Sequence, residues 1–173
     1  MTSALPEQAR RLLDQLTSWG IEHATTTHEA AFTVEDAQSL RGRIPGAHTK
    51  NLFLKDKKGH LYLVVALEDA QVDLKRLHKR IGAARLSFGK PELMQDVLGV
   101  RPGSVTPFAL INDTEHQVRL VLDENLLTHD QVNFHPLVNT ATTTISRDDL
   151  LKFFRHTGHE PLITSLAPEE GAE

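Results

Sequence analysis

The stretch His48-Thr-Lys-Asn-Leu-Phe-Leu-Lys-Asp56, continued by Lys57-Lys-Gly59 and by His60-Leu-Tyr-Leu-Val-Val-Ala-Leu67, decides the expected fold. Residues 48–56 and 60–67 have the composition of strands, and the polar, glycine-containing turn between them predicts a β-hairpin. The second strand is almost continuously apolar, which is typical of a strand buried on both faces. The hairpin therefore predicts a sheet at the centre of the molecule.

Lys50 and Asn51 stand where residues 41–49, a predicted loop with two glycines and a proline, enter this hairpin. The long, positively charged Lys50 side chain and the Asn51 amide are thereby placed at the edge of the core. Two interpretations remain open from position alone. The pair is either an ordinary solvated strand end or a group that holds a ligand.

A second informative stretch is Gly99-Val-Arg-Pro-Gly-Ser-Val-Thr-Pro-Phe-Ala-Leu110. Glycine supplies positive φ and proline locks φ, so two of each within nine residues predict a tight, rigid loop. The amides of residues 103–106, between the two prolines, are expected to be available for an anion or a developing oxyanion. The alternative is an ordinary turn before the strand predicted over residues 108–111.

The remaining periodicity predicts one domain in which helices and strands alternate, of the α/β or α+β class. Helices with their capping residues are predicted between residues 3 and 20, 33 and 40, 73 and 82, 91 and 99, and 146 and 158. Further strands are predicted over residues 21–27, 118–122 (a second hairpin with 108–111), 132–134, 142–145 and 160–166. The domain is expected to span residues 1–167, followed by a flexible tail over residues 168–173.

Composition excludes several classes of protein. The 173 residues are 39% hydrophobic and 24% charged, as in ordinary globular domains, and contain no cysteine. A disulfide framework, a thiol nucleophile and a cysteine-bound zinc are therefore excluded. No leader and no apolar run of the ~20 residues that cross a bilayer is found, so we expect a cytoplasmic protein without a membrane partner.

Charge is unevenly distributed along the chain. The net charge is −4, yet residues 41–90 hold twelve Lys and Arg against four Asp and Glu. In the helix predicted after Asp73, Lys75 with Lys79 and Arg76 with Arg80 form like-charge pairs four residues apart, which a phosphate backbone would relieve. Together with Arg85 they predict a face for a polyanion, and a merely solvated helix is the alternative.

Known catalytic motifs are otherwise missing. Ser104 lacks the second glycine of a nucleophile elbow, and neither dinucleotide-binding nor P-loop glycine patterns occur. The ten histidines include no His-Glu-x-x-His pair, so no metal and no cofactor are expected. In His135-Pro-Leu-Val-Asn139-Thr-Ala-Thr, His135 is either a satisfied strand-end histidine or a functional one, and Asn139 is either a turn former or a ligand.

Three separated motifs together resemble one family. Lys50-Asn51, the Gly103-x-x-x-Pro107 loop and His135-x-x-x-Asn139 occur in the order found in the YbaK/ProX family of aminoacyl-tRNA editing domains. The Ser-Val-Thr-Pro-Phe form of the loop is most similar to the free-standing alanyl-tRNA(Pro) deacylases. The resemblance implies a mostly antiparallel mixed sheet or partial barrel flanked by helices, and an activity that hydrolyses Ala-tRNA(Pro) without a metal.

The resemblance also implies a role for each residue. Lys50 would hold the terminal nucleotide or carbonyl, Asn51 and His135 would orient the ester and water, and the loop amides would bind the oxyanion. The catalytic set is Lys50, Asn51, Gly103, Ser104 and His135; the substrate-binding set is Val105, Thr106, Pro107 and Asn139; the tRNA-binding set is Lys75, Arg76, Lys79, Arg80 and Arg85.

The expected partners are the acceptor end of tRNA(Pro) carrying alanine and, beyond it, prolyl-tRNA synthetase. Exclusion of proline is expected to be steric, because one methylene in an apolar pocket changes binding by only ~1–3 kcal/mol. The alternatives are a Cys- or Ser-tRNA deacylase of the same fold and a non-catalytic module that binds tRNA or the synthetase.

Overall fold

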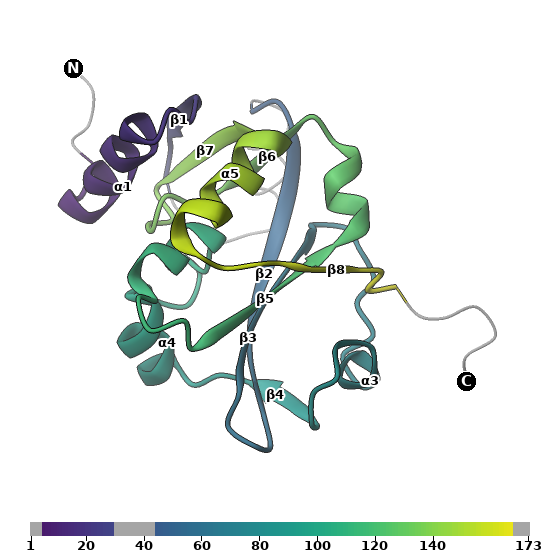
Figure 1. Ribbon diagram of the computed structural model, residues 1–173. Helices are drawn as coiled ribbons and strands as arrows, with labels where there is room; N and C mark the ends of the chain where they lie inside the picture. The colour runs from purple at the N-terminus through teal and green to yellow at the C-terminus, as the bar shows by residue number, and fades with distance from the viewer. Residues whose placement is uncertain (1–4, 30–43, 168–173) are drawn as a thin grey trace.

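The computed structural model describes residues 5–29 and 44–167 of the chain, and within them one twisted sheet is flanked by helices (Figure 1). The strands are β1 (His23–Thr27), β2 (Ala47–Asp56), β3 (Leu61–Leu67), β4 (Leu86–Phe88), β5 (Val118–Asp123), β6 (Gln131–Phe134), β7 (Ala141–Ser146) and β8 (Leu162–Thr164). The helices are α1 (Glu7–Ser18), α3 (Leu77–Ile81), α4 (Pro91–Leu98) and α5 (Arg147–Thr157), with 3₁₀ turns η1 (Pro107–Asn112) and η2 (Glu124–Thr128).

The predicted hairpin lies at the middle of this sheet. β2 and β3 pair antiparallel from Thr49 opposite Leu67 to Lys55 opposite Leu61. The order is β1-β7-β6-β2-β3-β5-β8, and β4 also pairs with β2. β1 with β7, β6 with β7 and β4 with β2 are antiparallel, whereas β2 with β6, β3 with β5 and β5 with β8 are parallel. The mixed, mostly antiparallel α/β sheet is therefore confirmed.

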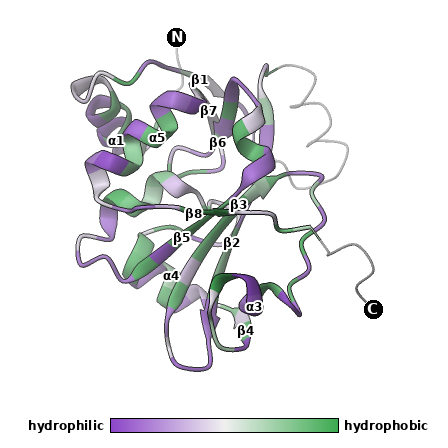
Figure 2. Ribbon diagram, turned by 45° about the vertical axis from the view of Figure 1, so that its right-hand side comes forward, coloured by the Kyte–Doolittle hydropathy of each residue, from purple (hydrophilic) through white to green (hydrophobic). Residues whose placement is uncertain are grey.

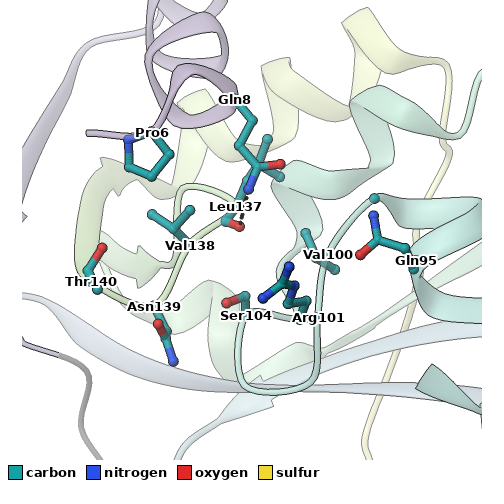
Figure 3. Close-up of a pocket in the computed structure, with 11 residues that line it drawn as sticks. Pro6, Gln8, Gln95, Val100, Arg101, Ser104, Leu137, Val138, Asn139 and Thr140 are labelled. Carbon is teal, nitrogen blue, oxygen red and sulfur yellow. Dashed lines mark hydrogen bonds between the residues drawn. The ribbon is translucent and has the colours of Figure 1, made fainter. Parts of the chain in front are cut away.

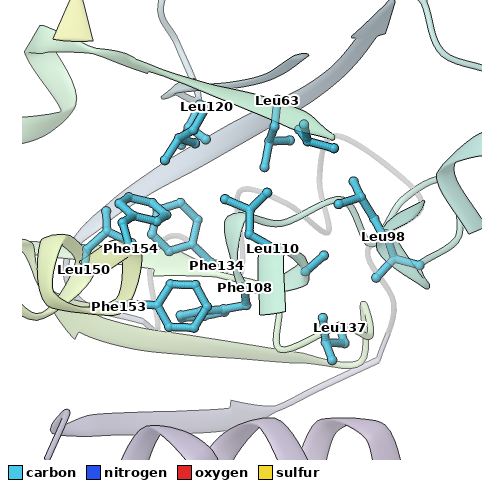
Figure 4. Packing of buried hydrophobic residues seen from close by; sticks show 14 of the residues in the cluster. Leu63, Leu98, Phe108, Leu110, Leu120, Phe134, Leu137, Leu150, Phe153 and Phe154 are labelled. Atoms are coloured by element: carbon cyan, nitrogen blue, oxygen red, sulfur yellow. The ribbon is translucent and has the colours of Figure 1, made fainter. Parts of the chain in front are cut away.

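Burial on both faces of β3 divides the interior into two cores. Leu63 and Val65 face the larger core, which α1, α4, α5 and η1 cover (Figure 4). Tyr62 and Val64 alternate with them and face a smaller core under α3. Figure 2 shows the strands at the centre as the hydrophobic part of the ribbon. The near-continuous apolar run is explained by these two covered faces.

The strand predicted over residues 108–111 is wrong, because these residues belong to the 3₁₀ turn η1. The Thr106 hydroxyl accepts the Phe108 amide at 3.3 Å and Pro107 occupies the first position, and both features favour a helical start. Phe108, Ala109 and Leu110 are buried in succession, so their apolar run reflects burial rather than a strand. The second hairpin is consequently wrong too, and β5 pairs with β3 and β8.

The helix predicted after Asp73 is shorter than expected, since α3 begins at Leu77. Residues 74–76 form a turn in which the Asp73 carbonyl, not its side chain, accepts the amides of Arg76 and Leu77. Lys75 and Arg76 therefore lie in the turn before α3, whereas Lys79 and Arg80 lie within it. β2 begins at Ala47, one residue before the strand predicted over residues 48–56, and β4 was not predicted. The helix predicted over residues 33–40 and the tail over residues 168–173 lie outside the described residues.

The other predicted elements are confirmed within one to three residues at each end. In α5, local capping residues explain this agreement. The Ser146 hydroxyl accepts the Asp149 amide at 3.0 Å, and Gly158 ends the helix in the left-handed conformation. Gly99 ends α4 in the same way, at the start of the proline-rich loop.

Candidate functional site

The loop between α4 and η1 is held by its own short-range hydrogen bonds. Gly103 adopts a φ of 91°, which favours glycine, and the Ser104 amide donates to the Arg101 carbonyl at 3.0 Å. Thr106 and Pro107 are buried, so their side chains fix the loop instead of standing free toward a ligand. Val105 is half-buried and packs against the larger core.

This loop leaves backbone donors available. The amides of Gly103, Val105 and Thr106 form no hydrogen bond with any described residue. The Ser104 amide is already used by Arg101, so the predicted set of four donors is reduced to three. Free amides in a rigid loop can bind an anion or a developing oxyanion without further reorganisation.

A second loop, between β6 and β7, faces the first one. Leu137 in this loop adopts a φ of 69°, and the Asn139 Nδ2 lies 3.6 Å from the position that a Cβ on Gly103 would occupy. Ser104 and Asn139 line the same cavity of about 400 Å³, with the two loops on opposite sides of it (Figure 3). The structure thus brings together two of the predicted motifs.

Sequence reasoning missed the polar side chains that complete the wall of this cavity. Gln8 from α1, Gln95 from α4 and Arg101 from the loop line it as well. The Gln8 side-chain amide donates to the Leu137 carbonyl at 3.5 Å. Gln8 and Gln95 come from helices without a motif, and Arg101 was not singled out within the proline-rich loop, so only the tertiary structure could have identified the three together.

His135 begins the second loop, directly after β6. Its Nδ1 lies 3.0 Å from the Ala141 carbonyl oxygen, which can only accept, so Nδ1 carries the proton and Nε2 keeps its lone pair. Burial lowers the pKa of His135 below its ordinary value of 6.5; the Ala141 carbonyl opposes this effect and the nearby His28 adds to it. The ring is therefore a neutral base at neutral pH.

Lys50 and Asn51 point to opposite faces of β2, because successive strand residues alternate. Asn51 is opposite Val65 and shares the face of the larger core, whereas Lys50 is opposite Ala66 and shares the face of the smaller one. The Lys50 ammonium donates to the Ala70 carbonyl. The Asn51 Oδ1 is buried without a hydrogen-bond partner among the described residues.

Lys50, Asn51 and His135 do not line the cavity of Ser104 and Asn139, but Lys50 and His135 both lie close to the junction of β2 and β6. β2 and β6 are parallel, and both residues follow the last pair, His48 with Asn133, by two positions. Thr49 reinforces this junction by donating to the Asn133 carbonyl at 2.7 Å.

The predicted tRNA-binding residues do not form one helix face. Lys75, Lys79 and Arg85 are exposed. Arg80 donates to the Ser165 carbonyl at 2.5 Å, and Arg76 lies 4.0 Å from the Asp73 carboxylate. The three exposed cations are therefore the members of the set most accessible to a polyanion.

No group of three or more His, Asp or Glu side chains suited to a metal ion occurs within residues 5–29 and 44–167. In the same two ranges, every helix is too short or too polar to cross a membrane.

Two comparisons identify the sheet with its loops as the fold of an aminoacyl-tRNA editing domain. The sequence model described as aminoacyl-tRNA editing domain matches residues 28–153, and the chain belongs to this family. A crystal structure of a candidate trans-editing enzyme for prolyl-tRNA synthetase has the same fold, with a TM-score of 0.72 at 23% identity over 96% of this chain and all of that one.

Three relatives show the range of names within the family. A prolyl-tRNA synthetase associated domain-containing protein 1 from Danio rerio is 40% identical over 93% of this chain and 89% of its own. The prolyl-tRNA editing protein ProX from Acetoanaerobium sticklandii is 36% identical over 80% and 85%. The multifunctional Ser/Thr-tRNA deacylase ProXp-y from Escherichia coli is 26% identical over 83% and 86%.

Proposed function

We propose that this protein hydrolyses the ester that joins a mischarged alanine to the 3′-terminal adenosine of tRNA(Pro) and leaves the prolyl ester intact. The observation that carries the proposal is the rigid loop with three unengaged amides, at Gly103, Val105 and Thr106, in which Gly103 lies beside Asn139. Membership of the editing-domain family supports the reaction class.

The proposed reaction needs no covalent enzyme intermediate, because an aminoacyl ester is already activated. Water adds to the carbonyl carbon, and the loop amides stabilise the resulting oxyanion. The bond to the ribose oxygen then breaks, that oxygen receives the proton that water gives up, and alanine and tRNA leave. The neutral Nε2 of His135 is suited to orient the water or to carry this proton.

Lys50 and Asn51 are assigned to substrate positioning. A lysine near the start of β2, held by the Ala70 carbonyl, presents a fixed cation to the terminal nucleotide or the carbonyl. The unpartnered Oδ1 of Asn51 is an acceptor that a donor on the substrate, such as the α-ammonium group, would satisfy.

Selection against proline is assigned to the rigidity of the loop. A small difference in apolar contact energy would not protect Pro-tRNA(Pro) from hydrolysis. The wall of the pocket must therefore clash with the proline ring. Thr106 capping η1 and the bond from Ser104 to Arg101 resist the movement that would admit it. Lys75, Lys79 and Arg85, with Arg76 and Arg80, are proposed to contact the acceptor end of the tRNA.

Two other functions follow from the names of relatives. The ProXp-y relative is called a Ser/Thr-tRNA deacylase, and serine differs from alanine by one hydroxyl that an apolar pocket rejects poorly. A cysteinyl ester of similar size is a third substrate of this kind. The remaining alternative is a non-catalytic module that binds tRNA or the synthetase, and it is compatible with the name of the relatives called prolyl-tRNA synthetase associated domain-containing proteins.

One assay distinguishes these functions. The purified protein is incubated with Ala-, Cys-, Ser-, Thr- and Pro-tRNA(Pro), and release of each amino acid is followed against time. Rapid loss of alanine with intact Pro-tRNA(Pro) is expected. Faster loss of serine, threonine or cysteine would assign a different substrate, and release of none would leave the non-catalytic role.

A further inference from the structure

An exposed aromatic ring borders a groove on the α3 side of the sheet. β4 pairs with β2 so that Phe88 lies opposite Leu54, whose side chain belongs to the smaller core. Phe88 and Leu54, with Leu74 and Leu86, form the apolar wall of a groove of about 380 Å³. α3 and β4 lie side by side at this end of the molecule (Figures 1 and 2). Phe88 is 62% exposed, more than any other large hydrophobic residue described.

The same groove carries positive charge. Lys75 and Arg85 line it, both are exposed, and neither forms an ion pair with a described residue. None of the lining residues is acidic. The nearest carboxylate along the paired strands, Asp56, is buried and accepts three backbone amides. The two cations are therefore free to meet an anion from outside.

A planar ring beside two unpaired cations fits a single-stranded nucleic acid. One base stacks on the ring, and the neighbouring phosphates meet the lysine and the arginine. An acidic peptide would use the charges but would not require an exposed aromatic ring. Charge and shape together favour an unpaired nucleotide as the occupant.

The position of the groove relative to Lys50 fits one strand of RNA. Lys50 and Leu54 lie on the same face of β2, four residues and therefore ~13 Å apart. A few nucleotides span this distance. The unpaired 3′ end of a tRNA has this length, with its terminal adenosine at Lys50.

We propose that the groove bounded by Phe88, Lys75 and Arg85 binds an unpaired base of the tRNA 3′ strand, upstream of the terminal adenosine. The placement of the 3′-terminal adenosine of the RNA at Lys50 rests on the proposed function. The stacking of a base on Phe88 adds a contact that is independent of the reacting ester.

Binding to unacylated RNA tests the inference without any hydrolysis. The probe is a fluorescent acceptor-stem hairpin of tRNA(Pro) with its unpaired 3′ end, titrated against the full chain by anisotropy. Phe88→Ala is expected to weaken binding about 10-fold. Phe88→Trp is expected to retain the affinity and to lose fluorescence on binding, measured against the wild type, whose single tryptophan, Trp19, stacks on His156.

Matched variants control for exposure and for charge. Leu162→Ala and Ile163→Ala remove exposed apolar side chains from β8 and should leave the affinity unchanged. Lys75→Ala and Arg85→Ala should each reduce the slope of log affinity against log salt by about 0.7. Arg155→Ala, which removes an exposed arginine on α5, should leave the slope unchanged.

Each outcome decides between the two proposals. Weaker binding by Phe88→Ala, with no release of alanine by the wild type, supports the groove and contradicts the deacylase. Normal deacylation with unchanged RNA affinity in Phe88→Ala contradicts the groove alone and assigns the exposed ring to another partner. A wild type that does not bind the hairpin overturns the inference.

Discussion

Asn139 lies against Gly103, with its Nδ2 3.6 Å from the place that a Cβ on the glycine would take. The contact joins the loop after α4 to the loop after β6, although Gly103 and Asn139 are 36 positions apart in the sequence. Gly103 also has a φ of 91°, so the same residue sets the conformation of the loop and contacts Asn139 in the wall of the cavity.

Gly103→Ala should reduce deacylation more than stability. A Cβ at this φ costs ~1–2 kcal/mol of the unfolding free energy, and relief of that strain would turn the amides away from the oxyanion. Gly59→Ala is the control, because Gly59 has a φ of 89° in the hairpin turn with nothing within 4 Å of the added Cβ. Both variants should lose similar stability in urea, and only Gly103→Ala should lose kcat. Equal kcat values would remove the loop from the reaction.

His135→Gln should lower kcat and flatten the dependence of stability on pH. The folded-state pKa lies below 6.5, so the unfolded chain binds the proton more readily and the unfolding free energy falls as the pH drops below 6.5. In the variant, the unfolding free energy should fall less between pH 8 and pH 5 than in the wild type. Urea unfolding at pH 8, 6 and 5 measures this difference. The exposed His129→Gln is the control. Identical pH profiles for His135→Gln and the wild type would contradict the assigned environment.

Lys50→Ala should abolish most turnover while the protein remains folded. The substitution removes a single hydrogen bond, from the Lys50 ammonium to the Ala70 carbonyl, which contributes about 1 kcal/mol to the unfolding free energy. Lys152→Ala is matched to it, since Lys152 donates to the Gly20 carbonyl at 3.3 Å from the surface of α5. Single-turnover rates should fall at least about 100-fold for Lys50→Ala alone. A normal rate in that variant would end the role given to Lys50.

Asp56→Asn should destabilise the central hairpin. Burial raises the pKa of Asp56, but the amides of His60, Ala84 and Lys58 outweigh it, and the net pKa is lowered from 3.8. The carboxylate therefore stabilises the fold above pH 3.8, and this contribution is lost as the pH falls further. We expect a loss of about 1–3 kcal/mol at pH 7 by urea unfolding. The exposed Asp130→Asn should lose almost nothing, and equal values for both would contradict the assigned bonds.

Local sequence determined the parts of the fold that local physics controls. The hairpin around Asp56–Gly59 and α5 with its Ser146 cap were predictable, because turn residues, caps and apolar periodicity act within a few positions. The motifs around Lys50, Gly103 and His135 were visible for the same reason. The family resemblance based on them is confirmed.

Tertiary structure decided what depends on distant neighbours. An apolar run such as 108–111 is compatible with a strand or a buried turn, and only packing between the sheet, α4 and α5 made it η1. The cavity shared by Ser104 and Asn139, and the groove beneath Phe88, are each assembled from segments that no local pattern links. Packing likewise decided which core each face of β2 meets, so that Asn51 shares the face of the larger core and Lys50 that of the smaller one.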